Sequence, residues 1–472
     1  MSVAENRDFL VKLFKDKNGK HDTGQARDIL PFLTKRTGAV RNQFNNISGE
    51  FTRNICQLKL EESKAKSDEF YLTSEENILS ENIASNVDFD NVDDQYDFTR
   101  FLDQYLFNGE KINPIHPFLF NYIKVDKKNK NEFGKYAQFM NDVLVKGDEN
   151  IKKIFNNKES EDILTELILS KMEGLKEDPK SSNNQYEPLI LPLSDLYKED
   201  LLYLSKHKEY FLDTFPLLTH FYVFIYACQV VYKFEQFTNS EYNHVQPLYF
   251  ALDWESISKR RKVADDIEGL KFIKTKAINI FPHIHTISQI SHLAYQGKVT
   301  GEKDEIIPFV PYSIALENIR AKGDEHADLF LEELNKWIVH YSEYWEITKP
   351  TKSATIEEAF ETLFHCLKQG VSEGVAEKYG KNIDDLGFNQ FIKNRGSLGQ
   401  VFNIKHDFLL LLTAVSVKDK RIPLNDLFTE FEKRGVAFDR YSKKEIIQVL
   451  DRLNIIDKKS DSGDAQYVKP IL

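Results

Sequence analysis

Residues 408–417, Phe408-Leu-Leu-Leu-Leu-Thr-Ala-Val-Ser-Val417, form an uninterrupted apolar run near the carboxyl end of the chain. A run of this length and composition predicts a short helix that is buried on all sides. Ile422-Pro-Leu-Asn-Asp426 then begins a second helix, because Pro423 suits a first helical turn. Apolar residues recur at helical spacing up to Gly435, a residue that readily ends a helix in the left-handed conformation. The segment therefore opens with two packed helices.

A third helix and a β-hairpin are predicted after Gly435. Ser442 and Glu445 match the S-x-x-E capping box, and the apolar residues after them recur at helical spacing. Segments 455–459 and 465–468 suit short strands, with a Ser-, Asp- and Gly-rich turn between them. Three helices followed by a hairpin is the order of a winged helix-turn-helix, which we predict for this C-terminal module.

The pattern leaves polar side chains of the third helix and of the wing facing outward. A recognition helix enters the major groove of DNA, and a wing can touch the backbone. Lysines and arginines would pair with phosphates, and Gln448 would reach a base edge. The predicted DNA-binding residues are Lys443, Lys444, Gln448, Arg452, Lys458 and Lys459. From Lys405 to Leu472 the chain has 13 Lys or Arg and 11 Asp or Glu, a net charge of only +2. Docking of a protein partner is therefore the competing interpretation.

The whole chain has 472 residues, of which 41% are hydrophobic and 29% charged, so it can bury a sizeable core. Only 20 glycines and 14 prolines interrupt it, which favours helices. We expect a mainly α fold with an N-terminal helical or mixed region over residues 1–112, a helical body over 113–394 and the winged-helix domain over 395–472. The net charge of −11 argues against diffuse nucleic-acid binding, so any DNA contact must come from a local patch.

Four segments before the C-terminal module carry specific expectations. Phe215–Phe234 is long and apolar enough to raise the question of a membrane span, but its internal Pro, His, Gln and Lys favour a buried core helix. Gly49–Cys56 alternates loosely and predicts a strand. Lys259–Lys276 reads as a long amphipathic segment. The acidic stretch Asp88–Asp97 predicts a solvated loop before a helix at Phe98–Phe107, because it lacks the Gly and the closing Glu of a calcium loop.

No catalytic motif is found in the sequence, which has no P-loop, nucleophile elbow, HExxH or dinucleotide-binding glycine pattern. Arg395-Gly-Ser-Leu-Gly399 lacks the Lys-Ser/Thr of a phosphate loop and predicts a plain turn between domains. His283 and His285 would share one face of a strand, as metal ligands sometimes do. No Cys or acidic partner lies nearby at ligand spacing, so hydrogen-bonded or solvent-facing histidines are favoured. We expect no enzyme activity, no metal site and no cofactor.

Lys259, Arg260, Arg261 and Lys262 follow Trp254 and form a predicted secondary basic patch. Such a patch would contact phosphate. The competing interpretation is an exposed helical turn with no ligand, because Lys and Arg are common there.

The three cysteines, Cys56, Cys228 and Cys366, are far apart and odd in number, which excludes a disulfide framework. We expect them to be buried and reduced. The N-terminal residues also lack the apolar stretch of a signal peptide. Both features favour a cytoplasmic protein without a membrane partner.

Three blocks of the C-terminal region carry a family resemblance. They are Arg395-Gly-Ser-Leu-Gly-Gln-Val-Phe-Asn403, the apolar stretch 408–413, and Lys458-Lys-Ser-Asp-Ser-Gly-Asp-Ala-Gln-Tyr-Val468. Together they resemble the C-terminal region of the DptG family, which belongs to bacterial DNA phosphorothioation-dependent restriction systems. The resemblance covers little more than this region, and the preceding body agrees with the family only in length and general character.

The resemblance implies a role in antiphage defence. Such systems place sulfur in the backbone of host DNA and restrict DNA that lacks it. The family acts beside a DptF-like ATPase and a DptH-like ATPase or helicase subunit, and it supplies no catalytic residues to carry over. We predict a non-catalytic accessory subunit that docks these partners and contacts double-stranded DNA or a partner through the winged helix. A cryptic metal-dependent nuclease and a winged-helix transcriptional regulator are the alternative predictions.

Overall fold

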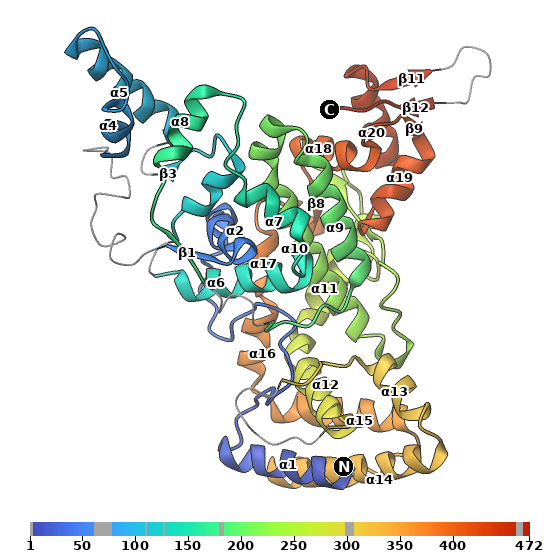
Figure 1. Ribbon diagram of the computed structural model, residues 1–472. Helices are drawn as coiled ribbons and strands as arrows, with labels where there is room; N and C mark the ends of the chain where they lie inside the picture. The colour runs from blue at the N-terminus through green and yellow to red at the C-terminus, as the bar shows by residue number, and fades with distance from the viewer. Residues whose placement is uncertain are drawn as a thin grey trace. The chain divides into compact units, whose positions relative to one another are not determined.

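The computed structural model describes residues 3–60, 78–108, 111–125, 128–178, 184–297, 306–458 and 466–472. These residues form a mainly α protein with short strands, which confirms the fold class predicted from composition (Figure 1). The chain divides into two compact units: unit 1 contains 1–41, 185–195 and 221–472, and unit 2 contains 42–184 and 196–220. The division at residues 112 and 394 that the sequence suggests coincides with no boundary of either unit and stays a prediction.

Unit 1 begins with α1 (Val3–Asp16), which packs against α12 (Ile280–Ala294) and α14 (Asp324–Tyr344). Leu10 and Phe14, one helical turn apart on α1, are buried. The Phe14 ring lies edge-on to Trp337 and Tyr341, at centroid distances of 5.5 and 5.6 Å. The amphipathic N-terminal helix is thus part of the aromatic core of this unit.

Unit 1 also contains helices outside this aromatic core. They are α11 (Leu270–Lys276), α13 (Tyr312–Arg320), α15 (Ile356–Gly370), α16 (Glu373–Gly380), α17 (Asn382–Gly387), α18 (His406–Val417), α19 (Leu424–Lys433) and α20 (Arg440–Arg452). Its strands are β5 (Leu248–Tyr249), β6 (Ala251–Leu252), β7 (Ile392–Asn394), β8 (Gln400–Ile404), β9 (Ile422–Pro423), β10 (Val436–Ala437), β11 (Ile456–Lys458) and β12 (Gln466–Val468).

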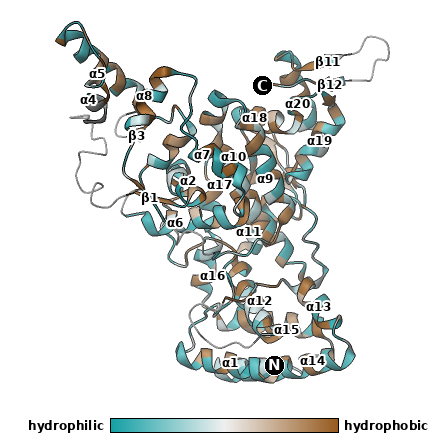
Figure 2. Cartoon of the chain, viewed as in Figure 1, coloured by the Kyte–Doolittle hydropathy of each residue, from teal (hydrophilic) through white to brown (hydrophobic). Residues whose placement is uncertain are grey.

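Two helices supply residues to both units, namely α9 (Leu191–Leu204) and α10 (Lys208–Phe234). Among the described residues, α10 is the one helix long and apolar enough to cross a membrane, and 89% of its most apolar window is buried. Figure 2 shows the run of hydrophobic residues along it. The core helix predicted for Phe215–Phe234 lies within α10.

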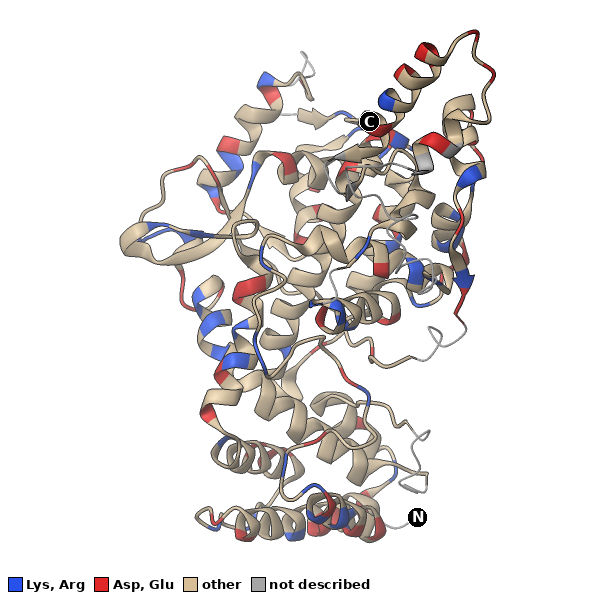
Figure 3. Ribbon diagram, turned by 90° about the vertical axis from the view of Figure 1, so that its left-hand side faces the viewer, with Lys and Arg blue, Asp and Glu red and all other residues tan. Residues whose placement is uncertain are grey.

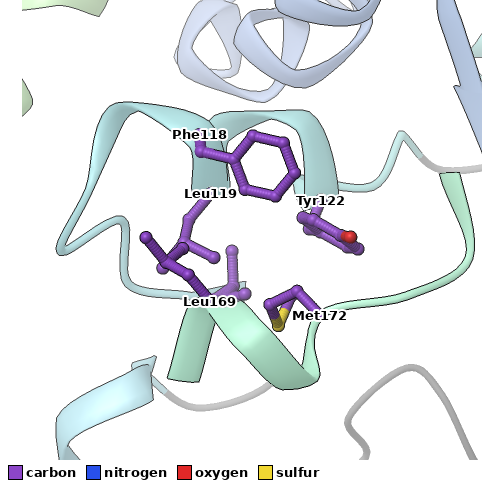
Figure 4. Close-up of a cluster of buried hydrophobic side chains, with 6 residues drawn as sticks. Phe118, Leu119, Tyr122, Leu169 and Met172 are labelled. Carbon is purple, nitrogen blue, oxygen red and sulfur yellow. The ribbon is translucent and has the colours of Figure 1, made fainter. Parts of the chain in front are cut away.

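Unit 2 has helices, 3-10 turns and two short antiparallel strand pairs. Its helical elements are η1 (Phe44–Ile47), α2 (Ser48–Cys56), α4 (Ile78–Ala84), α5 (Val92–Leu106), η3 (Pro117–Tyr122), α6 (Lys130–Phe139), the π-helical η4 (Met140–Val145), α7 (Glu149–Asn156) and α8 (Ile163–Lys171). Strand β1 (Leu58–Leu60) pairs with β4 (Leu175–Glu177), and β2 (Phe107–Asn108) pairs with β3 (Lys111–Ile112). One core cluster joins Phe118, Leu119 and Tyr122 of η3 to Leu169 and Met172 (Figure 4).

Three local predictions are wrong. Gly49–Cys56 is helix α2, because the buried Phe51 and Ile55 lie one helical turn apart on its inner face. In Lys259–Lys276 only α11 is α-helical. Before it, the backbone closes around Gly269, where a Cβ would lie 2.7 Å from two carbonyl oxygens. The acidic stretch is not all loop, since α5 already begins at Val92, with Asn91 as its N-cap.

The C-terminal module of unit 1 runs α18, β9, α19, β10, α20, β11, β12. Strand β12 pairs antiparallel with both β11 and β9, so a three-stranded sheet has the order β11-β12-β9. Strand β10 pairs instead with β5, in parallel. Gly435 (φ 82°) and Asn454 (φ 56°) lie in the left-handed region just after α19 and α20, as expected for residues that end helices. The three helices and the final strand pair occur in the predicted order, but strands β9 and β10 were not predicted. The predicted helix start at Ile422 is wrong, because Ile422–Pro423 forms β9 and α19 begins at Leu424. Membership in the winged-helix class stays a prediction.

Candidate nucleic-acid interface

Helix α20 is the element that carries most of the predicted DNA-binding residues. Its N-cap is Asp439, whose Oδ1 accepts hydrogen bonds from the backbone N–H groups of Tyr441 (3.0 Å) and Ser442 (3.1 Å). The predicted capping box at Ser442 and Glu445 is therefore wrong. Ser442 lies inside the helix and is fully buried.

The inner face of α20 is set by Ser442, Ile446 and Leu450, which are buried at spacings of four residues. Successive residues of a helix are rotated by about 100°, so residues four positions apart lie on nearly the same side. The face opposite the buried one carries such a row of residues. They are Arg440, Lys444, Gln448 and Arg452. Both Lys444 and Arg452 are exposed, and Gln448 is half-buried.

Two further side chains share this outer face, namely Tyr441, which is 50% exposed, and the exposed Asp451. Three cations and one carboxylate give the face a net charge of +2. A face of this kind can meet phosphate oxygens and still present an amide, that of Gln448, to a base edge. The structure thus brings Lys444, Gln448 and Arg452 together, as the helical spacing predicted.

Lys443 does not share that face. It is half-buried, with its ammonium 4.8 Å from the centre of the Phe428 ring and 3.7 Å from Glu432 Oε1. Its charge is thus partly satisfied within the module. For the predicted wing, the side chain of Lys458 and the whole of Lys459 lie outside the described residues.

A buried ionic cluster joins the N-terminus of α20 to the loop 253–262. The Arg261 guanidinium donates two hydrogen bonds to Asp439, from Nε (2.5 Å) and from Nη2 (2.8 Å). It also donates to Ser442 Oγ (2.9 Å) and lies 3.2 Å from Glu255 Oε1. Ser442 Oγ donates in turn to Glu255 Oε1 (2.8 Å). Arg261, Glu255 and Asp439 keep only 9%, 4% and 11% of their side-chain surface exposed.

Opposite charges control ionisation in this cluster. Burial by itself would raise the pKa of Asp439, but the hydrogen bond and charge of Arg261 and the two backbone donors outweigh it, so the pKa lies below its ordinary value. Burial would likewise lower the pKa of Arg261, and the carboxylates of Asp439 and Glu255 raise it instead. Asp439 and Arg261 therefore stay charged at neutral pH.

The predicted secondary basic patch is divided by these contacts. Arg261 forms ion pairs with Glu255 and Asp439 in the buried cluster. Lys262 pairs with Glu268 (2.5 Å), although its side chain remains 52% exposed. Lys259 and Arg260 are exposed. The four residues thus do not act as one positive surface, because at least half of their charge is paired within the protein.

Residues of the segment 395–403 position the same loop. The Arg395 guanidinium donates to the carbonyl oxygens of Leu252 (2.7 Å) and Glu255 (3.1 Å) and to Asn403 Oδ1 (3.0 Å). Asn403 Nδ2 donates to Asp253 Oδ1 (3.1 Å). Gly396 and Gly399, with φ of 61° and 75°, close the β7–β8 hairpin. The segment is a turn, as predicted, but its expected position between domains is wrong, because it joins two strands within unit 1.

An open cleft of about 1070 Å³ lies between the loop 256–262 and the first turn of α20. It is lined by Tyr249, Ser256, Ile257, Ser258, Arg260, Arg261, Lys262, Phe438, Asp439, Arg440, Tyr441 and Lys443. The Tyr441 ring receives two guanidinium groups, with the Arg440 and Arg261 carbons 4.6 and 4.9 Å from its centre. Arg440 also donates to the Tyr441 hydroxyl (2.6 Å). The cleft continues the cationic surface of α20 toward Arg260.

His283 and His285 lie on helix α12 and not on a strand, so residues two apart in the chain do not share one face. His283 Nδ1 is 3.0 Å from the Tyr312 hydroxyl, and its Nε2 is 3.5 Å from Glu235. Burial lowers the pKa of His285 to about 3. Both are buried core histidines, and no group of three His, Cys, Asp or Glu side chains able to hold a metal occurs in the described part of the chain.

Several residues of this region were missed by sequence reasoning. Arg440 and Tyr441 precede the expected helix start, and Glu255 and Asp439 were not singled out. Asp439 could have been found from the sequence, because Asp is a preferred N-cap residue. Its side chain accepts hydrogen bonds from the backbone N–H groups two and three residues later, here those of Tyr441 and Ser442. No local signal pointed to Glu255, whose partner Ser442 lies 187 residues away.

No protein-family model matches this chain, and no curated protein matches its sequence.

Proposed function

We propose that this chain is a non-catalytic accessory subunit of a DNA phosphorothioation-dependent restriction complex that contacts double-stranded DNA through the outer face of α20. The observation that carries the DNA contact is the row Arg440, Lys444, Gln448 and Arg452 on that face. The row lies in a module whose strand and helix order suits groove binding. The kind of complex is supported by the resemblance of 395–403, 408–413 and 458–468 to the DptG family.

Two features make the α20 face suitable for this task. Its orientation is held by the buried cluster of Arg261, Glu255, Asp439 and Ser442, so the helix does not have to be ordered on binding. The adjoining cleft adds Arg260 and Arg440 at one end of the same cationic surface. The remaining role, docking of a DptF-like ATPase and a DptH-like ATPase or helicase subunit in the cytoplasm, follows from the resemblance.

The test is a titration of the full chain with duplex DNA at several salt concentrations. In the variant Lys444→Glu/Arg452→Glu we expect weaker binding, and a slope of log K against log salt reduced by about 2, because each phosphate contact contributes close to one unit. The control Lys352→Glu/Lys368→Glu makes the same charge change at exposed lysines of unit 1 away from α20 and should keep the wild-type slope.

Gln448→Ala separates base readout from phosphate contact. We expect nearly unchanged affinity averaged over sequences and weaker discrimination among them, since a base-edge contact is worth about 1–3 kcal/mol. If the double variant and its control bind DNA equally, α20 is not the DNA-contacting element and a protein-docking role takes its place.

A further inference from the structure

A strong concentration of negative charge lies in α4, α5 and the loop between them. Residues 78–108 contain seven Asp or Glu and one Arg, a net charge of −6, whereas the whole chain of 472 residues has −11. More than half of the net negative charge is therefore carried by one short segment of unit 2. Figure 3 shows how the acidic and basic residues are distributed along the chain. The function proposed above makes no use of this segment.

Only one face of α5 packs against other helices of unit 2. Leu102 and Leu106 point inward and form a buried cluster with Ile83 of α4 and Ile168 of α8. Five aspartates of the loop and of the first turns of α5 are exposed, namely Asp88, Asp90, Asp93, Asp94 and Asp97. They therefore form a solvent-facing acidic surface.

Large apolar side chains are exposed among these carboxylates. Val92 and Tyr96, one turn apart on α5, are 79% and 69% exposed, and Phe101 is 47% exposed. The Phe101 ring stacks on Phe98 (6.3 Å between centroids) and Tyr105 (5.5 Å). Exposed aromatic residues bordered by charge are typical of a surface that a partner covers.

The charge determines what kind of partner fits. A nucleic acid would be repelled by six net negative charges, and an acidic protein likewise. A protein surface that binds nucleic acid is complementary to α5 in charge and in apolar character. It presents rows of Lys and Arg that contact phosphates, and often apolar or aromatic residues on which bases stack.

We propose that α5 and its preceding loop dock on a basic, nucleic-acid-binding surface of a partner subunit, where they occupy the place of the DNA backbone. This inference rests on the proposed function, since it needs a partner that handles DNA. It adds a regulatory consequence: DNA and the α5 surface compete for the same groove, so docking holds the partner off DNA until the subunit is displaced.

The test uses the full chain and the purified DptF-like and DptH-like subunits as probes, with binding measured over a series of salt concentrations. The charge variant is Asp90→Lys/Asp93→Lys/Asp97→Lys, which brings segment 78–108 from −6 to zero. Asp94 is left unchanged because it is hydrogen-bonded to Asn91. The apolar variant is Tyr96→Ser. The matched control makes the same charge change on exposed residues of unit 1, Glu325→Lys/Asp328→Lys/Glu361→Lys.

We expect wild-type protein to bind one of the two subunits with an affinity that falls with salt and is competed by duplex or single-stranded DNA. The charge variant should bind at least about tenfold more weakly, because it removes complementary charge, and Tyr96→Ser should also weaken binding. Circular dichroism should show wild-type helix content in both variants.

Three results overturn the inference in distinguishable ways. If wild-type protein binds neither subunit, the proposed complex fails, and the docking surface with it. If the charge variant binds as well as the control, only the docking surface fails. If binding depends on α5 but DNA does not compete, the partner surface is not the one that holds nucleic acid.

Discussion

Helices α20 and α5 are built by the same local rules and present opposite charge. Each is capped by the side chain of the preceding residue, Asp439 or Asn91, and each buries one apolar face. The outer face of α20 carries a net +2, whereas the segment around α5 carries −6. They differ most in the contacts that fix their position. Helix α20 is fixed by a buried ionic cluster in which Asp439 binds Arg261, 178 positions away in the chain. Helix α5 is fixed by apolar contacts with α4 and α8. Orientation is therefore specified more strictly for the basic helix than for the acidic one.

The largest expected effect comes from breaking the ionic cluster. Arg261→Met leaves the buried Glu255 and Asp439 carboxylates without their cation, which should lower the free energy of unfolding by about 3–5 kcal/mol. Urea denaturation measures this loss. The exposed Arg260→Met is the matched control and should change stability by less than about 0.5 kcal/mol. Equal effects of the two substitutions would contradict the importance assigned to the cluster.

The second effect tests the apolar attachment of α5. Leu102 is fully buried, so Leu102→Ala should cost about 2–4 kcal/mol by creating a cavity. Hydrogen exchange should accelerate in α4 and α5 and stay unchanged in α20. Faster exchange in α20 as well would mean that the two helices do not belong to separate compact units.

A smaller effect compares the two N-caps. Asn91→Ala removes one capping acceptor and should cost about 1 kcal/mol. Asp439→Ala removes the cap and also the strongest partner of Arg261, so it should cost clearly more. The difference between the two variants, measured by chemical denaturation, reports the ionic cluster alone. A difference near zero would show that Asp439 acts as a cap and nothing else.

The smallest expected effect is on the stability of the fold at acidic pH. The pKa of Asp439 lies below its ordinary value of 3.8 when folded, so its carboxylate stabilises the fold above that value and loses this contribution as the pH falls through the folded pKa. Arg261→Met removes the main cause of the lowering. The stability of the variant should therefore fall less steeply than that of the wild type below about pH 4. Parallel curves from urea titrations at successive pH values would contradict this linkage.

The sequence by itself determined the mainly α class, the order of three helices and a terminal strand pair after residue 405, and the row Lys444, Gln448 and Arg452. These features are local, because helical periodicity, Gly435 and Asn454 act within a few residues of the chain. Gly49–Cys56 marks the limit of such patterns, since eight residues with few apolar positions fit a strand or a helix and packing selects between them.

Only the tertiary structure decided which charges remain available. Arg261 looks like any basic surface residue in the sequence, yet its guanidinium is buried between Glu255 and Asp439, and Ser442 leaves its expected capping role to bind Glu255. Lys443 and Lys444 are neighbours in the sequence, but one lies over Phe428 and the other faces solvent. The physical reason is that desolvation and ion pairing depend on groups far away in the chain, and no local pattern records them.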